Sequence, residues 1–406
     1  MTGPGEGGWP VLHGLRVADL STLLAAPQVG AVLADLGADV VKVEPPQGDP
    51  LRNLGTRRHG VSLPYLMVNR RKRCVEVDFA SPEGLAELYR LLGLVDVVVL
   101  NQPRSVLESW GCSPEQLLER DPGLVVVTVS CYGWTGPFGG RAGNGSLAEA
   151  FGGLTNLTGV PDGPPVLPSV PLGDSLVGMA GALAAIAGCW GRDAGSRRDV
   201  EGHSSAGGRH VDVSMYEPVI TLLGTALGGW EPGTPPPERT GSRVAGGAPR
   251  NVYRARDGRY LVVSATTDGQ ARRALEAVGA GGMTERFASG AQRAAHADEI
   301  DELVARWIEQ RDRDDAMTTL AGAGVPVAPL HDLSELVEHP QVRARGSVAR
   351  LSDPVAGTVL APGPVARFSG CSDPEPAPPT PAVPARTVID GWRVGNADGA
   401  RSGSPA

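Results

Sequence analysis

Lysine, cysteine and aromatic residues are scarce in this 406-residue chain. Lys42 and Lys72 are its only lysines, and aromatic residues make up 4% of the sequence. The five cysteines are scattered and form no CxxC pair. The sequence therefore predicts neither a zinc site nor a disulfide framework, and we expect reduced thiols in a cytoplasmic protein.

Motifs that would identify a cofactor, a membrane span or a nucleic-acid site are also lacking. No GxGxxG follows the first predicted strand, so we expect no NAD or flavin site of the usual type, and no GxxxxGK[ST], GxSxG or HExxH occurs. The chain opens without a signal-peptide pattern, and its most apolar stretch, 172–190, is rich in glycine and alanine, so no membrane span is expected. The net charge of −8 argues against general nucleic-acid binding.

Apolar residues make up 41% of the chain, which is enough for a real core. The first part alternates strand and helix patterns, which predicts a parallel, doubly wound α/β sheet. The expected strands are 15–20, 39–44, 74–79, 95–100 and 124–130, and the expected helices between them are 27–36, 81–92 and 113–119. A buried helix is predicted at 175–190, a strand at 210–214 and a further helix at 216–227.

A proline- and glycine-rich segment, 231–249, then resembles a linker. A new unit begins at Asn251 with a predicted hairpin, 252–256 and 259–265, whose turn is Asp257-Gly258. Helices are expected near 268–278, 296–310 and 314–321. From 372 the chain is rich in proline and then in glycine and serine, and we expect disorder there.

Asp174 is the main candidate for chemistry. It lies in the segment Pro171-Leu-Gly-Asp-Ser-Leu-Val-Gly178, just before the predicted helix 175–190. Aspartate is a preferred helix N-cap, which is a sufficient structural interpretation. The helix amides and dipole would also hold the carboxylate ionised, and such a group can act as a covalent nucleophile toward an acyl group.

Two further features have both a functional and a structural interpretation. The glycines Gly241, Gly246 and Gly247 form a loop that could offer backbone amides to an oxyanion, although an ordinary flexible linker is an equally good interpretation. The run Arg70-Arg71-Lys72-Arg73 is a basic island suited to phosphates, although such runs are more often solvated turns.

Taken in order, these segments resemble the class III CoA-transferases of the CaiB–BaiF type over roughly residues 12–370. The resemblance is carried by LADLGADVVKVEPPQGDPLR, NRRKRCVEVDFASPEG, DPGLVVVTVSCYGWTGP, RAGNGSLAEAFGGLTNLTGVPDGPP, PLGDSLVGMAGALAAI, HVDVSMYEPV and GGAPRNVYRARDGRYLVVSA, among others.

The resemblance implies an α/β fold and an interlocked homodimer. A Rossmann-like large domain would be built from the N-terminal part 10–230 and the C-terminal part 330–371. A linker with the glycine loop, 231–250, would lead to a smaller inserted α+β domain, 251–329, and 372–406 would be a disordered tail.

The resemblance also implies a mechanism. Asp174 falls on the nucleophile that attacks an acyl-CoA and carries aspartyl anhydride and aspartyl-CoA intermediates, with CoA passing to an acceptor carboxylic acid. Gly246 and Gly247 fall on a glycine loop that covers it. The positions expected to hold CoA are Leu24, Ala26, Lys42, Arg52, Lys72, Arg73, Asn101 and Arg104. Acyl-CoA and an acid are the expected substrates, with no metal.

The chain departs from the family pattern near the expected acyl pocket. Leu24 replaces a residue that is often polar, and an Asp-x-x-x-Gln pattern reads Gly145…Glu149. Asn144 stands where related racemases carry a catalytic histidine, which disfavours racemase activity. Two alternatives to CoA transfer stay open: acyl transfer to an amine or alcohol, and a non-catalytic protein that binds CoA esters.

Overall fold

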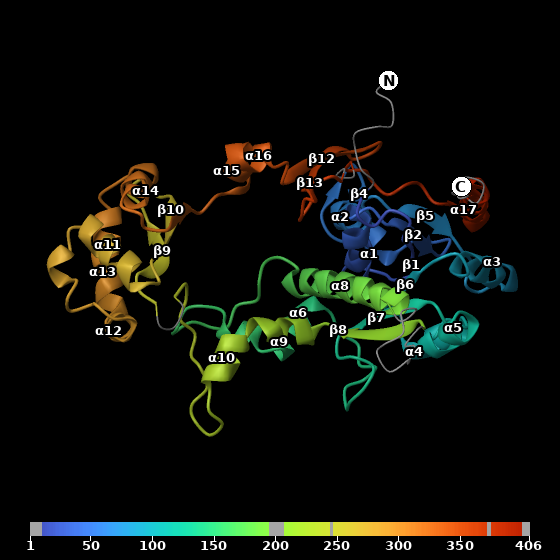
Figure 1. Cartoon of the computed structure of the whole chain (residues 1–406), viewed down its shortest axis with the longest axis horizontal. Coiled ribbons are helices and arrows are strands. Elements are labelled where there is room, and N and C mark those ends of the chain that lie inside the picture. The colour runs from blue at the N-terminus through green and yellow to red at the C-terminus, as the bar shows by residue number, and fades with distance from the viewer. Residues whose placement is uncertain (1–9, 195–206, 244–246, 372–374, 400–406) are drawn as a thin grey trace, which may run out of the picture. The chain divides into compact units, whose positions relative to one another are not determined.

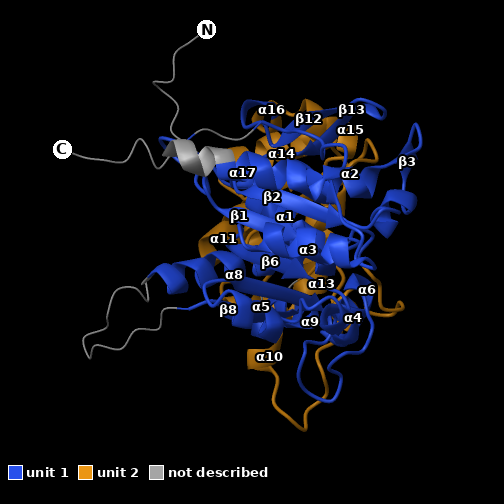
Figure 2. Cartoon of the chain, turned by 90° about the vertical axis from the view of Figure 1, so that its right-hand side faces the viewer, with its two compact units in different colours: residues 1–154, 168–225, 343–406 blue, residues 155–167, 226–342 orange. Residues whose placement is uncertain are grey.

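The computed structural model describes residues 10–194, 207–243, 247–371 and 375–399. The chain divides into two compact units (Figure 2). Unit 1 comprises 1–154, 168–225 and 343–406, and unit 2 comprises 155–167 and 226–342.

Unit 1 is built on a sheet of seven strands, all paired in parallel (Figure 1). Their spatial order is β14 (Val383–Pro384), β5 (Arg73–Glu76), β2 (Asp39–Glu44), β1 (Arg16–Asp19), β6 (Val97–Leu100), β7 (Val125–Ser130) and β8 (Arg209–Ser214). Without β14, this is the 3-2-1-4-5-6 order of Rossmann-like sheets. The predicted parallel α/β sheet is confirmed.

Helices cover both faces of this sheet, because its strands present apolar side chains on both sides. Val97 and Val99 face one core, and Val98 between them faces the other. The first core includes α1 (Ala25–Asp35), α6 (Gly145–Phe151) and α8 (Leu172–Ala194). The second includes α3 (Pro82–Leu92), α4 (Arg104–Ser109), α5 (Pro114–Arg120) and α17 (Ala385–Gly399).

Local sequence sets where several helices begin. Ser81 caps α3 by accepting a hydrogen bond from the Gly84 amide, and Pro82 fills the first turn. Ser113 and Gln116 form a capping box at the start of α5. The remaining elements that lie in unit 1 are η1 (Pro50–Asn53), β3 (Arg57–Arg58), β4 (Val61–Ser62), α2 (Leu63–Asn69), α9 (Tyr216–Leu222), β12 (Val348–Asp353) and β13 (Gly357–Pro362).

Helix α8 begins earlier than predicted, which places Asp174 inside the helix and not before it. The expected helix 175–190 is extended to Leu172–Ala194, so Asp174 is the third helical residue and not the N-cap. By length and composition α8 could cross a membrane, and it is the one such helix in the described part of the chain. Here it packs against α1, β7 and β8 of unit 1.

Unit 2 contains an antiparallel sheet in the order β11 (Val327–Pro329), β10 (Tyr260–Ser264) and β9 (Arg250–Arg254). The predicted hairpin is present as β9 and β10. The helices of this unit are α11 (Asp268–Ala277), η2 (Gly281–Met283), α12 (Gly290–Ala295), α13 (Ala297–Ile308), α14 (Arg313–Gly322) and α15 (Leu333–Glu338). The unit boundaries fall within α7 (Leu154–Leu157), α10 (Gly224–Gly229) and α16 (Pro340–Ala344).

Segment 155–167 belongs to unit 2, outside the small domain expected at 251–329. Arg239 explains the association, because its guanidinium donates to the backbone oxygens of Asn156, Val160 and Gly163. These contacts join segments far apart in sequence.

The disorder expected from 372 onward is wrong for residues 383–399. Strand β14 joins the large sheet beside β5, and α17 follows it. Val388, Ile389 and Trp392 are buried in the second core, and the Trp392 indole donates to Asp39. Three apolar residues at helical spacing are therefore enough to anchor a segment whose overall composition is polar.

Candidate active site

A large cavity in unit 1 opens at the carboxyl ends of the strands. It has a volume of about 960 Å³. Loops after β1, β6 and β7 line it, together with the start of α8. The chain order reverses between β1 and β6, and α/β sheets bind ligands outside the strand ends at such a point.

Asp174 lines this cavity from the first turn of α8. Its carboxylate lies against the backbone of Gly145, the first residue of α6. A Cβ atom at position 145 would stand only 2.7 Å from Asp174 Cγ. Only glycine leaves room for the carboxylate in this arrangement.

The surroundings of Asp174 raise its pKa to about 6. Burial is the main cause, the negative charge of Glu149 adds to it, and a backbone hydrogen bond at Asp174 opposes both. The sequence predicted that the helix amides would hold this carboxylate ionised, and the backbone hydrogen bond does act in that direction. Desolvation outweighs the amides, so the carboxylate is more basic than usual and is still mostly ionised at neutral pH.

Glu149 lies on α6, one helical turn after Gly145, and it is 2% exposed. Its Oε1 accepts a hydrogen bond from the Gly173 amide at 2.7 Å, directly before Asp174. The sequence identified Glu149 as a departure from the family pattern but gave no sign that it would meet Gly173. That contact depends on how α6 packs against α8.

Two arginines line the cavity, and they differ in whether a described acidic side chain already pairs with the guanidinium. Arg104 is paired with Glu108 at 3.0 Å and with Glu115 at 3.1 Å. Arg141 lies 3.8 Å over the ring of Phe138 and forms no ion pair with a described carboxylate. Arg141 was not among the site residues predicted from the sequence. Its only signal was its place in the RAG segment just before Asn144.

The loop after β1 contributes Leu24 to the cavity wall. Asn101, at the end of β6, holds this loop through a reciprocal pair of hydrogen bonds with Thr22, of 2.9 and 2.8 Å. Leu23 has a φ of 68°, in the left-handed region that non-glycine residues seldom adopt. Of the eight positions expected to hold CoA, the structure thus places Leu24, Asn101 and Arg104 on the cavity.

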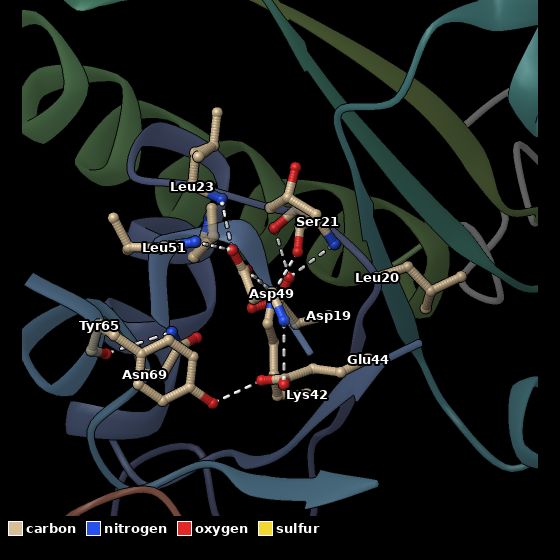
Figure 3. Close-up of polar contacts among 12 residues, drawn as sticks. Asp19, Leu20, Ser21, Leu23, Lys42, Glu44, Asp49, Leu51, Tyr65 and Asn69 are labelled. Carbon is tan, nitrogen blue, oxygen red and sulfur yellow. Dashed lines mark hydrogen bonds and ion pairs between the residues drawn. The ribbon is translucent and has the colours of Figure 1, made fainter. Parts of the chain in front are cut away.

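Lys42 lies next to this loop, at Ser21 (Figure 3). The side chains of Lys42 and Lys72 are both fully buried. Lys42 pairs with Asp49 at 2.9 Å and donates to the Ser21 carbonyl. Lys72 pairs with Asp19 at 2.6 Å. Both ammonium groups are therefore used within the protein. That these lysines contact CoA directly stays a prediction, and Lys42 is one of the residues that line the smaller cavity described below.

The buried charges position the loop backbone. Asp19 accepts hydrogen bonds from the Ser21 amide and hydroxyl, and Asp49 accepts from the Leu23 amide at 3.3 Å. Burial lowers the pKa of Lys72 to about 8, although Asp19 opposes this. For Asp19, the two lysines outweigh burial and lower the pKa of the carboxyl.

The other positions expected to hold CoA lie apart from the cavity. Arg52 forms an ion pair with Glu44 at 2.7 Å and donates to the Tyr65 hydroxyl. Arg73 pairs with Asp39, and both residues stand at the amino ends of their strands, at the edge opposite the cavity. Ala26 is fully buried inside α1.

The predicted basic island is therefore largely neutralised by ion pairs, because Arg70 also pairs with Asp35. Of the two predicted loop glycines, Gly246 lies outside the described residues and Gly247 belongs to unit 2. No group of three or more His, Cys, Asp or Glu residues in the described ranges could hold a metal ion.

The model of the family described as CoA-transferase family III matches residues 12–387. The chain belongs to this family. A CoA-transferase of family III transfers CoA and takes CoA thioesters as substrates. This chain is therefore an enzyme that transfers CoA.

Relatives and solved structures agree with this assignment. The chain is 35% identical to succinyl-CoA–D-citramalate CoA-transferase of Chloroflexus aurantiacus over 362 residues, which is 88% of each chain. It is 31% identical to succinate–glutarate CoA-transferase of Agrobacterium fabrum, covering 83% of this chain and 84% of the relative. A CAIB/BAIF family protein from Brucella suis matches with a TM-score of 0.79 and 29% identity, over 95% of this chain and 99% of that one.

Proposed function

We propose that this enzyme moves CoA from an acyl-CoA to a carboxylic acid through covalent intermediates on Asp174. One observation carries the proposal: Asp174 is the only carboxylate among the described residues that line the large cavity. It is also partly desolvated, with a pKa of about 6, so it is both ionised at neutral pH and unusually basic. A carboxylate in that state is suited to nucleophilic attack on a thioester.

The proposed reaction proceeds in four balanced steps. An Asp174 oxygen attacks the thioester carbonyl, and the C–S bond breaks to give an acyl–aspartyl anhydride and CoA thiolate. The thiolate attacks the aspartyl carbonyl, which releases the donor carboxylate and forms aspartyl-CoA. The acceptor carboxylate attacks this thioester and displaces thiolate again. Thiolate then attacks the acceptor carbonyl, giving the new acyl-CoA and free Asp174.

A second cavity provides space for the rest of CoA. It has a volume of about 490 Å³, and it shares Thr22 and Gln102 with the large cavity. Phe79 and Trp110 line it and are stacked at 4.1 Å between ring centroids. We propose that the adenine end of CoA lies in this smaller cavity and that the thioester reaches Asp174 through the larger one.

Arg141 supports a short dicarboxylic acid as one of the substrates. The relatives are named for succinyl-CoA with citramalate and for succinate with glutarate. A guanidinium stacked on Phe138 keeps its N–H edge available for a carboxylate, and no described acidic side chain occupies it. We propose that Arg141 binds the second carboxylate of such a substrate.

The glycine loop and the homodimer remain part of the proposal. The assignment of Gly246 and Gly247 to the catalytic glycine loop stays a proposal that rests on the resemblance. One face of α8 supports a partner subunit, because Met179, Leu183 and Trp190 are 53%, 70% and 71% exposed. Size-exclusion chromatography with light scattering would measure the assembly.

Trapping tests the proposed chemistry. The protein is incubated with succinyl-CoA or glutaryl-CoA, treated with hydroxylamine or borohydride, and mapped by peptide mass spectrometry. We expect a modification on Asp174 that Asp174→Asn abolishes. Product analysis then separates the alternatives: acyl transfer to an amine or alcohol leaves no new acyl-CoA. A protein that only binds CoA esters leaves no modification with any acyl-CoA.

A further inference from the structure

Glu149 is a buried acid without a counter-ion. It is 2% exposed, and no described cationic side chain pairs with it. Its described hydrogen bond comes from the Gly173 amide, at 2.7 Å from Oε1. Burying a charged carboxylate costs free energy unless a counter-ion or hydrogen bonds compensate it. At Glu149 the described compensation is the hydrogen bond from the Gly173 amide.

The location of Glu149 couples two helices at Asp174. Glu149 lies on α6, and Gly173 is the second residue of α8, directly before Asp174. A Cβ atom at position 173 would lie 2.9 Å from the Gly145 carbonyl oxygen and 3.2 Å from Glu149 Oε1. The two helices thus approach at Gly145 and Gly173, where neither residue has a side chain.

The chain also differs here from the family pattern, in which an Asp stands at position 145 and a Gln at 149. Positions i and i+4 share one face of a helix. The acidic residue of this chain, Glu149, is therefore one helical turn after position 145 on the same face of α6. Position 145 itself is a glycine, and the Asp174 carboxylate occupies the space next to it.

We propose that Glu149 is a positioning residue for Asp174: it fixes the first turn of α8 through the Gly173 amide and holds a buried acidic group close to the Asp174 carboxylate. This inference rests on the proposed function of Asp174. A neutral glutamine at 149 would keep the hydrogen bond, since its carbonyl oxygen also accepts from an amide. It would remove only the charge.

Among the described residues, the neighbouring helix α1 has no charged group near Asp174, and the other charged groups around it, Arg141 apart, are paired with other residues. Helix α1, which packs along α8, carries no titratable residue before Asp35. Ser214 donates to Glu217 of α9, and Arg104 is paired with acids on its own side of the cavity. Among the described residues, Cys131 and Arg141 also line the cavity, and Tyr132 and Tyr216 pack against α6. Asp212 accepts a hydrogen bond from the amide of Trp134 in the cavity wall. The negative charge of Glu149 is the largest charge effect on the pKa of Asp174 after burial itself.

The test compares Glu149→Gln, Glu149→Ala and the matched control Glu217→Gln. In the wild type we expect kcat/KM to fall as pH drops through about 6, as Asp174 is protonated. In Glu149→Gln the acid limb moves to lower pH, and kcat at pH 7.5 falls several-fold because the carboxylate is less basic. Glu149→Ala also loses the hydrogen bond, and its kcat falls by roughly a further ten- to hundredfold. Glu217→Gln keeps the wild-type profile.

An acid limb in Glu149→Gln identical to that of the wild type would overturn the proposal. A second measurement does not depend on activity. Melting temperatures of wild type, Asp174→Asn, Glu149→Gln and the double variant are measured at pH 7.5. We expect Asp174→Asn to raise the melting temperature less when Glu149 is already neutral. Additive shifts would refute the coupling, even if trapping located the covalent chemistry elsewhere.

Discussion

The carboxylate of Asp174 rests directly on the backbone of Gly145, with no space for a side chain between them. The contact joins α8 to α6 and forms one end of the large cavity. Both the position and the protonation of Asp174 therefore depend on a neighbouring helix that is distant in sequence.

Gly145→Ala should impair turnover much more than folding. The new Cβ would collide with the Asp174 carboxylate and displace it, and a misplacement of about 1 Å at a reacting group can cost roughly a hundredfold in rate. We expect kcat for succinyl-CoA to fall by about that factor. The control is Gly224→Ala, because no atom stands within 4 Å of a Cβ there. Equal rates in the two variants would contradict the placement of Asp174.

Asp174→Asn should stabilise the protein at neutral pH and not in acid. The folded pKa of about 6 exceeds the unfolded value of 3.8, so the folded state binds more protons between these pH values. Stability of the wild type therefore falls as pH rises through this window. Asparagine does not titrate, and we expect a gain of about 1–3 kcal/mol at pH 7, with little difference near pH 4.

Urea unfolding at both pH values checks this. Asp162→Asn serves as the control because Asp162 is exposed. A gain for Asp174→Asn that is the same at both pH values would show that its carboxylate is not perturbed.

Arg141→Met should change substrate preference. Loss of the guanidinium removes a partner for the second carboxylate, so we expect KM for succinate or glutarate to rise about tenfold or more, while KM for butyrate is unchanged. Arg141→Lys should recover only part of the effect, since it lacks the bidentate geometry. Arg272→Met, in an exposed pair with Glu276, is the control. A parallel loss with mono- and dicarboxylic acids would argue against this role.

Lys42→Met should lower the free energy of unfolding. It leaves Asp49 as a buried charge without its partner, and breaking a buried pair in this way costs about 3–5 kcal/mol. We expect a lower urea midpoint, which Asp49→Asn in the same chain partly restores. Arg57→Met, at an exposed position, should be neutral. A variant with normal stability and lost CoA binding would return Lys42 to the role of a CoA ligand.

Much of the fold of unit 1 could be predicted from the sequence, because each strand and helix carries its own local pattern. The apolar runs at 39–44 and 124–130 are strands within one residue of their predicted ends, and Ser81 and Ser113 begin their helices as expected. The candidate nucleophile was also identified from its sequence motif, and the structure places it in the cavity.

What the sequence could not decide is where each charge would lie. Lys42 and Lys72 resemble cofactor contacts in the sequence, but Asp49 and Asp19 meet them only once β1, β2 and β5 are side by side. By itself, the sequence determined most of the elements and pointed to the residue proposed to react, since periodicity, caps and motifs are local. The tertiary structure alone decided which charges are neutralised, and it gave Asp174 its pKa, because burial and the approach of Glu149 arise from packing between distant segments.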